Sequence, residues 1–67
     1  MNENTKGFLQ GVAYACAELK RNHDQGMMAY EIMSAAGLTT PDKLKAAKVD
    51  EYDAKTCRQI IKEERRS

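Results

Sequence analysis

The sequence predicts one all-α domain, a compact bundle or orthogonal array of about four short helices. Apolar residues recur every three or four positions, and no stretch alternates with the period of two that is typical of a strand. Turn signals near residues 24–26, 37–41 and 49–50 divide the chain into four segments. The chain has 67 residues, 42% of them hydrophobic, so we expect a single domain over 1–67.

The first predicted helix covers residues 6–22 and carries an amphipathic stripe. At 100° per residue, the residues that share its apolar face are Phe8, Val12, Ala15, Cys16 and Leu19. The residues on the opposite face are Gln10, Ala13, Ala17 and Arg21. We expect the apolar stripe to face the core and residues 1–5 to be frayed.

The second predicted helix covers residues 27–36, and Asp24 can cap its start because a carboxylate accepts the free N–H groups of a first turn. Its predicted apolar face consists of Met28, Ile32, Ala35 and Ala36. Gly37 occupies the position of a left-handed residue that ends a helix, and Leu38 can make the apolar contact of a Schellman motif.

The third helix is expected over residues 41–48, with Thr40 as N-cap and Pro41 at the first helical position. Leu44 and Ala47 are its inward candidates. The lysines that we expect to face solvent are Lys43, Lys45 and Lys48.

Asp50 is the predicted N-cap of a fourth helix that ends near Arg65. Val49 can contact Ala54 as a hydrophobic staple, and residues 63–67 are expected to fray. The predicted buried stripe consists of Ala54, Cys57, Ile60 and Ile61.

Composition argues against several classes of protein. A net charge of +1 gives no global field toward nucleic acid or an anionic membrane, and no apolar stretch is long enough for a membrane span. We therefore expect a cytoplasmic protein. Cys16 and Cys57 fall on apolar faces, where we expect reduced, buried thiols with raised pKa. No cofactor is expected, and two cysteines with one histidine are a poor zinc-ligand set.

A catalytic site is not expected either. His23 beside Asp24, together with a cysteine, could form a nucleophile–base arrangement, but adjacency in sequence does not provide triad geometry. Helix capping explains both residues, so we expect a protein that is not an enzyme.

Gly7, Gly11 and Ala15 are spaced four apart, which permits close approach of another helix. Such an approach can occur inside the fold or between two copies. Because so short a chain has a marginal core, we predict a homodimer in which Gly7 and Gly11 make the contact.

Methionines and tyrosines outside the apolar stripes are candidates for a partner-binding surface, since both residue types suit interfaces. These candidates are Met27, Tyr30, Met33, Tyr14 and Tyr52. Packing at helix edges is the alternative explanation for the same residues.

Two other binding functions remain open. The second and third helices with the intervening turn resemble a helix-turn-helix, in which Lys43, Lys45 and Lys48 would contact DNA, although no Arg, Asn or Gln is suitably placed to read bases. A small anionic ligand could instead bind at a helix N-terminus or at a dimer seam lined with lysines.

Two segments carry a resemblance: AELKRNHDQGMMAYEIMSAAGL over Ala17–Leu38 and AAKVDEYDAKTCRQIIKE over Ala46–Glu63. Together they resemble small helical accessory proteins of tailed phages and prophages, in which Gly26 is often proline and Lys48 is often glycine. The resemblance implies a protein that acts in the host cytoplasm. It further implies a non-enzymatic binding module that inhibits or modulates a host or host-defence protein by covering a surface.

Overall fold

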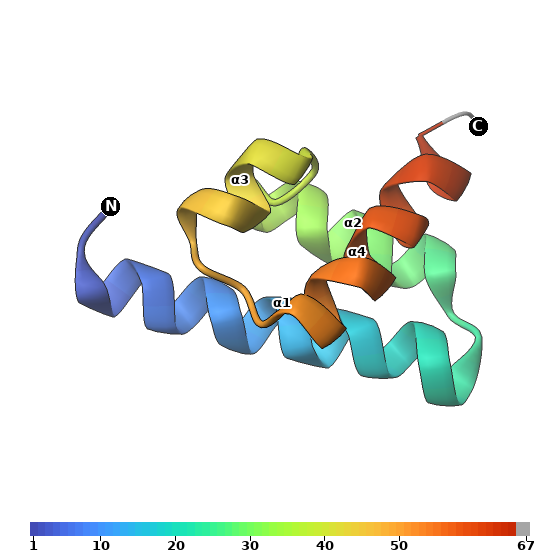
Figure 1. Cartoon of the computed structure of the whole chain (residues 1–67). Helices are drawn as coiled ribbons and strands as arrows, with labels where there is room; N and C mark the ends of the chain where they lie inside the picture. Colours follow the sequence, from blue (N-terminus) through green and yellow to red (C-terminus); the bar gives the residue numbers. More distant parts are fainter. Residues whose placement is uncertain (66–67) are drawn as a thin grey trace.

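The computed structural model describes residues 1–65, which contain four helices and no strand. The helices are α1 (Glu3–His23), α2 (Gly26–Ala36), α3 (Pro41–Ala46) and α4 (Glu51–Glu64). The long helix α1 runs the length of the molecule, α2 and α4 lie along the same side of it, and α3 lies above its N-terminal half (Figure 1). The predicted all-α architecture is confirmed for these residues, while part of the fraying predicted for 63–67 lies outside them.

Helix α1 begins at Glu3, three residues before the predicted start. Asn2 is its N-cap, because the Thr5 N–H donates to Asn2 Oδ1 at 2.8 Å. The carboxylate of Glu3 lies in the first turn, at the positive end of the helix dipole. The segment for which we predicted fraying therefore contains a capped first turn.

The end of α1 differs from the prediction that Asp24 caps α2. Asp24 has φ 52°, a left-handed conformation, and the N–H groups of Asp24 and Gln25 both donate to the Leu19 carbonyl. Gln25 occupies the N-cap position of α2 without a capping hydrogen bond from its side chain. The prediction was wrong because the chain reverses at Asp24, which makes this residue the end of one helix rather than the start of the next.

Helix α2 ends in the predicted Schellman motif. Gly37 has φ 78°, and its N–H donates to the Ser34 carbonyl at 3.1 Å. The Leu38 N–H donates to the Met33 carbonyl at 2.8 Å. Leu38 and Met33 are both completely buried, which provides the apolar contact that accompanies this motif.

Helix α3 ends at Ala46, two residues before the predicted end, in the same hydrogen-bonding pattern. Lys48 has φ 56°, its N–H donates to the Lys45 carbonyl, and the Val49 N–H donates to the Leu44 carbonyl at 3.1 Å. Gln10 of α1 supports this end because its Nε2 donates to the Ala47 carbonyl at 2.9 Å. The predicted N-cap is confirmed, since the Lys43 N–H donates to Thr40 Oγ1.

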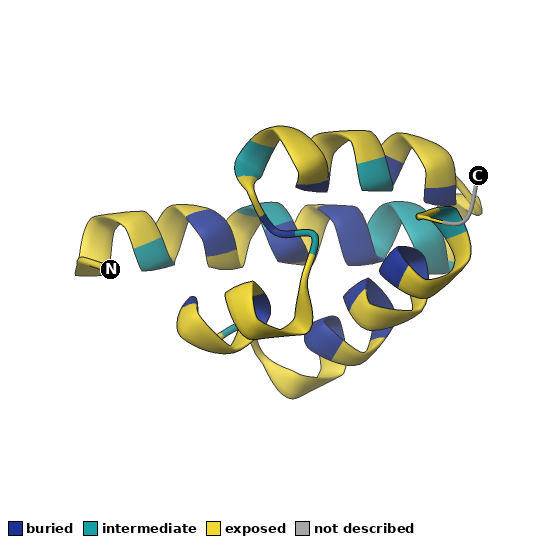
Figure 2. Ribbon diagram, turned by 90° about the horizontal axis from the view of Figure 1, so that it is seen from above, coloured by how far each residue is buried: buried dark blue, intermediate teal, exposed yellow. Residues whose placement is uncertain are grey.

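The buried face of α1 is rotated relative to the predicted stripe. Of the predicted residues Cys16 is completely buried, whereas Phe8 is 65% exposed and Ala15 is also exposed. Buried and exposed stretches alternate along α1 (Figure 2). The residues that α1 buries are Leu9, Ala13, Cys16 and Ala17. The reason is the close packing of α1 against both α2 and α4, which favours alanine over phenylalanine at the contact.

The buried face of α2 is rotated as well. Met28 and Ile32, which were predicted to face the core, are 52% and 42% exposed, and Ala35 is exposed too. The residues that α2 buries are Gly26, Ala29 and Met33. Met33 fills the centre of the core because it is long enough to reach between the other helices, whereas glycine and alanine let the backbones approach.

The predicted faces of α3 and α4 are confirmed. Leu44 and Ala47 are buried, while Lys43, Lys45 and Lys48 are exposed. The predicted stripe of Ala54, Cys57, Ile60 and Ile61 is buried along α4. Asp50 is the N-cap, because its Oδ2 accepts from the Tyr52 N–H at 3.1 Å.

Candidate protein-binding surface

This packing leaves large apolar side chains exposed on both α1 and α2. Three of them are Phe8, in the N-terminal half of α1, and Met28 and Ile32 of α2. Val12 and Leu19 of α1 are partly buried neighbours that pack against the core from the same helices. Contiguous apolar surface of this kind marks binding sites more often than scattered single residues do.

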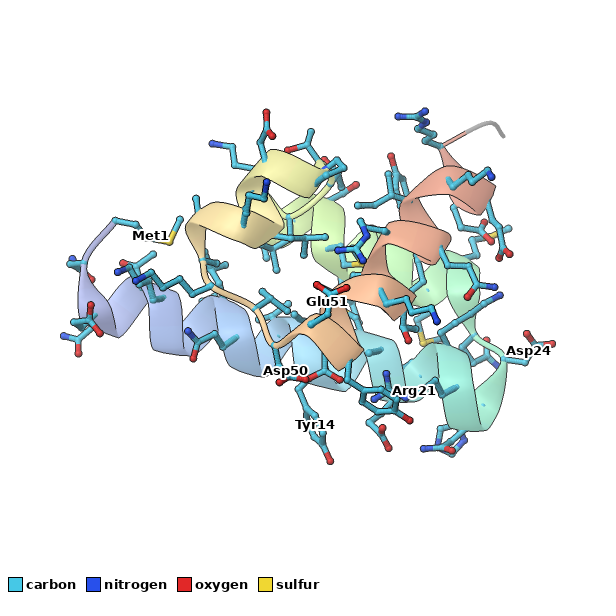
Figure 3. The ribbon with its side chains drawn as sticks, viewed as in Figure 1. Met1, Tyr14, Arg21, Asp24, Asp50 and Glu51 are labelled. Carbon is cyan, nitrogen blue, oxygen red and sulfur yellow. The ribbon has the colours of Figure 1, made fainter. Side chains whose placement is uncertain are left out.

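Helical geometry places the α1 members of this group on one flank. Arg21 and Gln10 lie on the opposite flank, where they contact α4 and the end of α3. Tyr14 lies on the flank of Arg21 and points away from the bundle (Figure 3). At 100° per residue, Phe8, Val12, Ala15 and Leu19 therefore lie on the flank of α1 beside α2.

Met28, Ile32 and Ala35 follow one another at the i, i+4, i+7 spacing of a helix flank. Helix α2 runs back along α1 in the opposite direction (Figure 1). For two antiparallel helices whose buried faces meet in one core, the helical positions of these residues place this flank on the same side of the molecule as the exposed flank of α1. The two flanks together form a surface that we call the apolar face. It consists of Phe8, Val12, Ala15, Leu19, Met28, Ile32 and Ala35.

Gly7 and Gly11 lie on the exposed side of α1, opposite its buried residues. A Cβ atom built on either glycine would have no neighbouring atom within 4 Å. The close helix crossing that was one explanation for these glycines therefore does not occur within residues 1–65. Their role in contact between two copies stays a prediction.

The predicted partner-binding residues do not form one surface. Met33 is completely buried, so its expected place on the surface is wrong. Met27 is exposed and Tyr30 is a partly buried edge of the core. Tyr14 is exposed on the flank of α1 that carries Arg21 (Figure 3). Tyr52 of α4 is exposed and lies against Arg21, away from the apolar face.

Tyr52 is part of a polar cluster that joins α1 to α4. The Arg21 guanidinium lies 4.2 Å from the centre of the Tyr52 ring. It also donates to Asp53 Oδ1 at 3.0 Å, to Thr56 Oγ1 at 3.0 Å and to Glu18 Oε2 at 2.7 Å. Hydrogen bonds to Glu18 and Asp53 raise the pKa of Arg21. These charged groups serve the packing of two helices.

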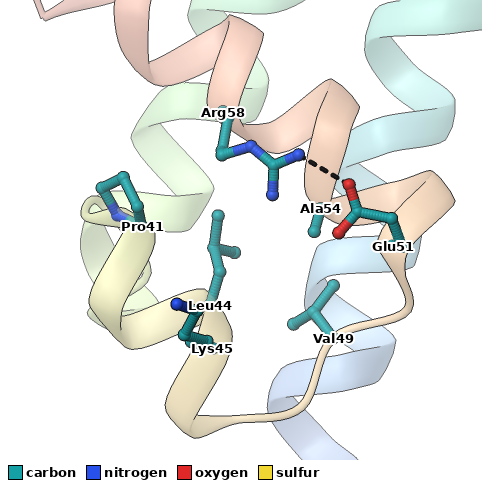
Figure 4. A pocket seen from close by; sticks show the side chains of 7 residues that line it. All are labelled: Pro41, Leu44, Lys45, Val49, Glu51, Ala54 and Arg58. Atoms are coloured by element: carbon teal, nitrogen blue, oxygen red, sulfur yellow. Dashed lines mark hydrogen bonds and ion pairs between the residues drawn. The ribbon is translucent and has the colours of Figure 1, made fainter.

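A shallow pocket of about 270 Å³ lies between α3 and α4 (Figure 4). Its apolar lining includes Val49 and Ala54, the predicted hydrophobic staple; the remaining lining residues are Pro41, Leu44, Lys45, Glu51 and Arg58. Arg58 donates to Glu51 at 2.7 Å across one side of the pocket. This bond lowers the pKa of Glu51, and it engages one of the two cations of the lining, the other being Lys45.

The groups considered for catalysis are not assembled. His23 and Asp24 are exposed at the end of α1, whereas Cys16 and Cys57 are completely buried. Burial raises the pKa of both thiols, that of Cys57 to about 12. The prediction of buried cysteines with raised pKa is confirmed. Residues 1–65 hold no group of three metal-ligating side chains and no helix long and apolar enough to cross a membrane.

Comparisons with protein-family models, curated proteins and solved structures find no match for this chain. The resemblance to phage proteins therefore stays a prediction.

The apolar face was missed at the sequence level because its residues have the spacing and character of a helical core. One signal was present: α1 has apolar residues on more than one face, since Leu9, Ala13 and Ala17 lie outside the predicted stripe. A helix in a small bundle cannot bury so wide an arc within its own fold.

Proposed function

We propose that this chain is a protein-binding module that associates with its partner through the apolar face. The observation that carries the proposal is the exposure of large apolar side chains on that face: Phe8, Met28 and Ile32 are between 42% and 65% exposed. Covering apolar area yields about 25 cal/mol per Å², so a partner gains most by binding here.

The state of the charged groups supports binding over catalysis. Two ion pairs of the described residues join α1 to α4: Arg21 pairs with Asp53 at 3.0 Å, and Lys20 pairs with Glu63 at 2.8 Å. Shifted pKa values in such pairs are explained by the fold and require no reaction. Modulation of another protein by covering its surface is the mode of action that we infer.

The proposal is tested by charge substitution on the apolar face. Phe8→Glu and Ile32→Glu should abolish affinity capture of a binding protein from nuclease-treated bacterial lysate, because burial of a carboxylate in an apolar contact is unfavourable. Tyr14→Glu is the matched control, since Tyr14 is 57% exposed on the other flank of α1. Circular dichroism should show the same helix content in all variants. Equal capture by all variants would remove the apolar face from the function.

DNA binding is the second candidate, favoured by the exposure of Lys43, Lys45 and Lys48 around α3. Helix α3 has six residues, about 9 Å of helix, which leaves a short element for a major groove about 12 Å wide. This candidate predicts retention that is lost on nuclease treatment and weakened by replacing the three lysines with glutamine. It also predicts that Phe8→Glu has no effect.

A further inference from the structure

We propose that the pocket between α3 and α4, together with a row of cations along α4, is a separate binding site for an acidic segment of a protein partner. One large apolar side chain of that segment enters the pocket, and its carboxylates meet the cations. The site goes beyond the proposed function, because it shares no residue with the apolar face. Pocket size, the spacing of the cations and their charge each support it.

The pocket is of a size for one side chain. Its volume is about 270 Å³, whereas pockets that hold drug-sized molecules have about 300–1,000 Å³. Leu44, Val49 and Ala54 line it, with Lys45 on its α3 side and Arg58 on its α4 side (Figure 4). An apolar side chain that fills a pocket is a common anchor of protein interfaces. The two cations favour acidic residues next to that anchor.

The cations continue from the pocket along the exposed side of α4. Four of them follow one another at the i, i+3, i+7, i+10 spacing of one helix face. They are Lys55, Arg58, Lys62 and Arg65, all of them exposed, and with Lys45 we call them the basic row. At 1.5 Å per residue, the part on α4 is about 15 Å long. This length suits a segment of polypeptide better than a small anion.

The basic row concentrates positive charge on one side of the molecule. Its five cations face a chain whose net charge is only +1, so the remainder of the chain is net negative. Within residues 1–65, Arg58 alone of the five forms an ion pair, at 2.7 Å with Glu51. The Glu51 side chain is 79% exposed, so this pair contributes little stability and a partner carboxylate can replace it. Such a concentration of charge steers an acidic partner to this side.

The lining of the pocket favours an acidic protein over nucleic acid. None of its seven residues is aromatic, so a base would find no ring on which to stack. A phosphate backbone would leave Pro41, Leu44 and Val49 without an apolar contact. A polypeptide that carries both carboxylates and an apolar side chain matches both parts of the site.

Fluorescence anisotropy on the purified full chain tests the proposal with a labelled peptide. The probe has about twelve residues, enough to span the basic row as a helix, and consists of aspartate and glutamate around one central phenylalanine. The wild type should bind it at least about tenfold more tightly than two comparison peptides. One has alanine in place of phenylalanine, and the other has lysine in place of every acidic residue. Phe8→Glu should bind the probe like the wild type.

Charge reversal in the basic row supplies the matched variants. Lys45→Glu and Lys62→Glu should each raise the dissociation constant of the probe by at least about tenfold. Lys43→Glu is the control, because it makes the same change of charge on the side of α3 opposite the pocket. Its dissociation constant should stay within about threefold of the wild-type value. All three lysines are exposed, so circular dichroism should show equal helix content.

A wild type that does not bind the acidic peptide at near-millimolar concentration would overturn the proposal. Equal effects of Lys43→Glu and Lys45→Glu would also overturn it, because binding would then follow net charge alone. A DNA duplex that binds more tightly than the peptide would assign the basic row to nucleic acid. The proposed function is tested separately, since it depends on Phe8 and Ile32 and not on the lysines.

Discussion

Lys48 is held in a conformation that its β-carbon disfavours. Its φ of 56° lies in the left-handed region, where it ends α3 in the manner of a C′ glycine. The surrounding hydrogen bonds fix this geometry, because the Val49 N–H reaches the Leu44 carbonyl only when the chain reverses at Lys48. A residue without a β-carbon would relieve the crowding.

Lys48→Gly should stabilise the protein. Left-handed geometry costs a non-glycine residue about 1–2 kcal/mol, while the added freedom of glycine in the unfolded chain costs roughly 0.4–1 kcal/mol. The free energy of unfolding should therefore rise by about 0.5–1 kcal/mol, measured by urea denaturation. The control Lys45→Gly lies within helical α3 and should lose about 1 kcal/mol. Destabilisation by both substitutions would contradict the argument.

Cys57 should make stability depend on pH in the alkaline range. Burial raises the pKa of its thiol from 9.0 to about 12 in the folded state, so the unfolded chain ionises first. The stabilisation is complete below pH 9.0 and is lost as pH rises toward 12. Near pH 10.5 the loss should reach about 2 kcal/mol.

Urea midpoints at about pH 8 and about pH 10.5 measure this effect. The decrease between the two pH values should be smaller in Cys57→Ala than in the wild type, because the variant has no thiol to ionise at this position. The comparison uses the change with pH, since removal of the sulfur also opens a cavity that lowers stability at every pH. An identical decrease in both proteins would assign the alkaline sensitivity to other groups.

At the scale of helices, the sequence predicted the elements better than their orientation. Caps and stops that depend on neighbouring residues, such as Thr40, Gly37 and Asp50, were confirmed. The predicted buried faces of α1 and α2 were wrong, because a pattern of apolar residues favours the face that carries the largest side chains. The contacts between α1, α2 and α4 instead select small ones such as Ala13 and Ala17. The same misassignment hid the apolar face.

The rotation of α1 can be tested with two alanines. Ala13 is completely buried and its carbonyl accepts from the Cys57 thiol at 3.6 Å, whereas Ala15 is exposed. Ala13→Leu should destabilise by about 1–3 kcal/mol through overpacking, and Ala15→Leu should stay within about 0.5 kcal/mol. Urea denaturation at low protein concentration, where association is negligible, measures both. The reverse order would restore the stripe predicted from the sequence.

Arg21 is the main polar connection between α1 and α4, and its replacement should matter more than that of a surface ion pair. Asp53 is 8% exposed and would lose its cation in Arg21→Met, although the apolar stem would still pack. Arg58→Met is the matched control, because its partner Glu51 is 79% exposed. The urea midpoint should fall clearly for the first variant and change little for the second. Equal decreases in the urea midpoint would show that the Arg21 cluster contributes no more to stability than an exposed ion pair does.

At the scale of the whole molecule, stability and association are linked. In this chain of 67 residues Phe8 is 65% exposed, so part of the apolar surface remains in contact with solvent and outside the core. A partner that covers this surface binds the folded chain and not the unfolded one, so mass action raises the unfolding temperature with the partner's concentration.

The homodimer predicted from the sequence would act in the same way, so the unfolding temperature of the wild type should rise with protein concentration. While the dimer predominates, each tenfold increase adds ~0.7 kcal/mol per chain, half of the 1.4 kcal/mol for the dimer. For a domain of this size, that free energy corresponds to roughly 3–6 °C. A wild-type temperature that stays constant over a wide range of protein concentration would show that folding is complete within each chain. The apolar face would then contribute to binding alone.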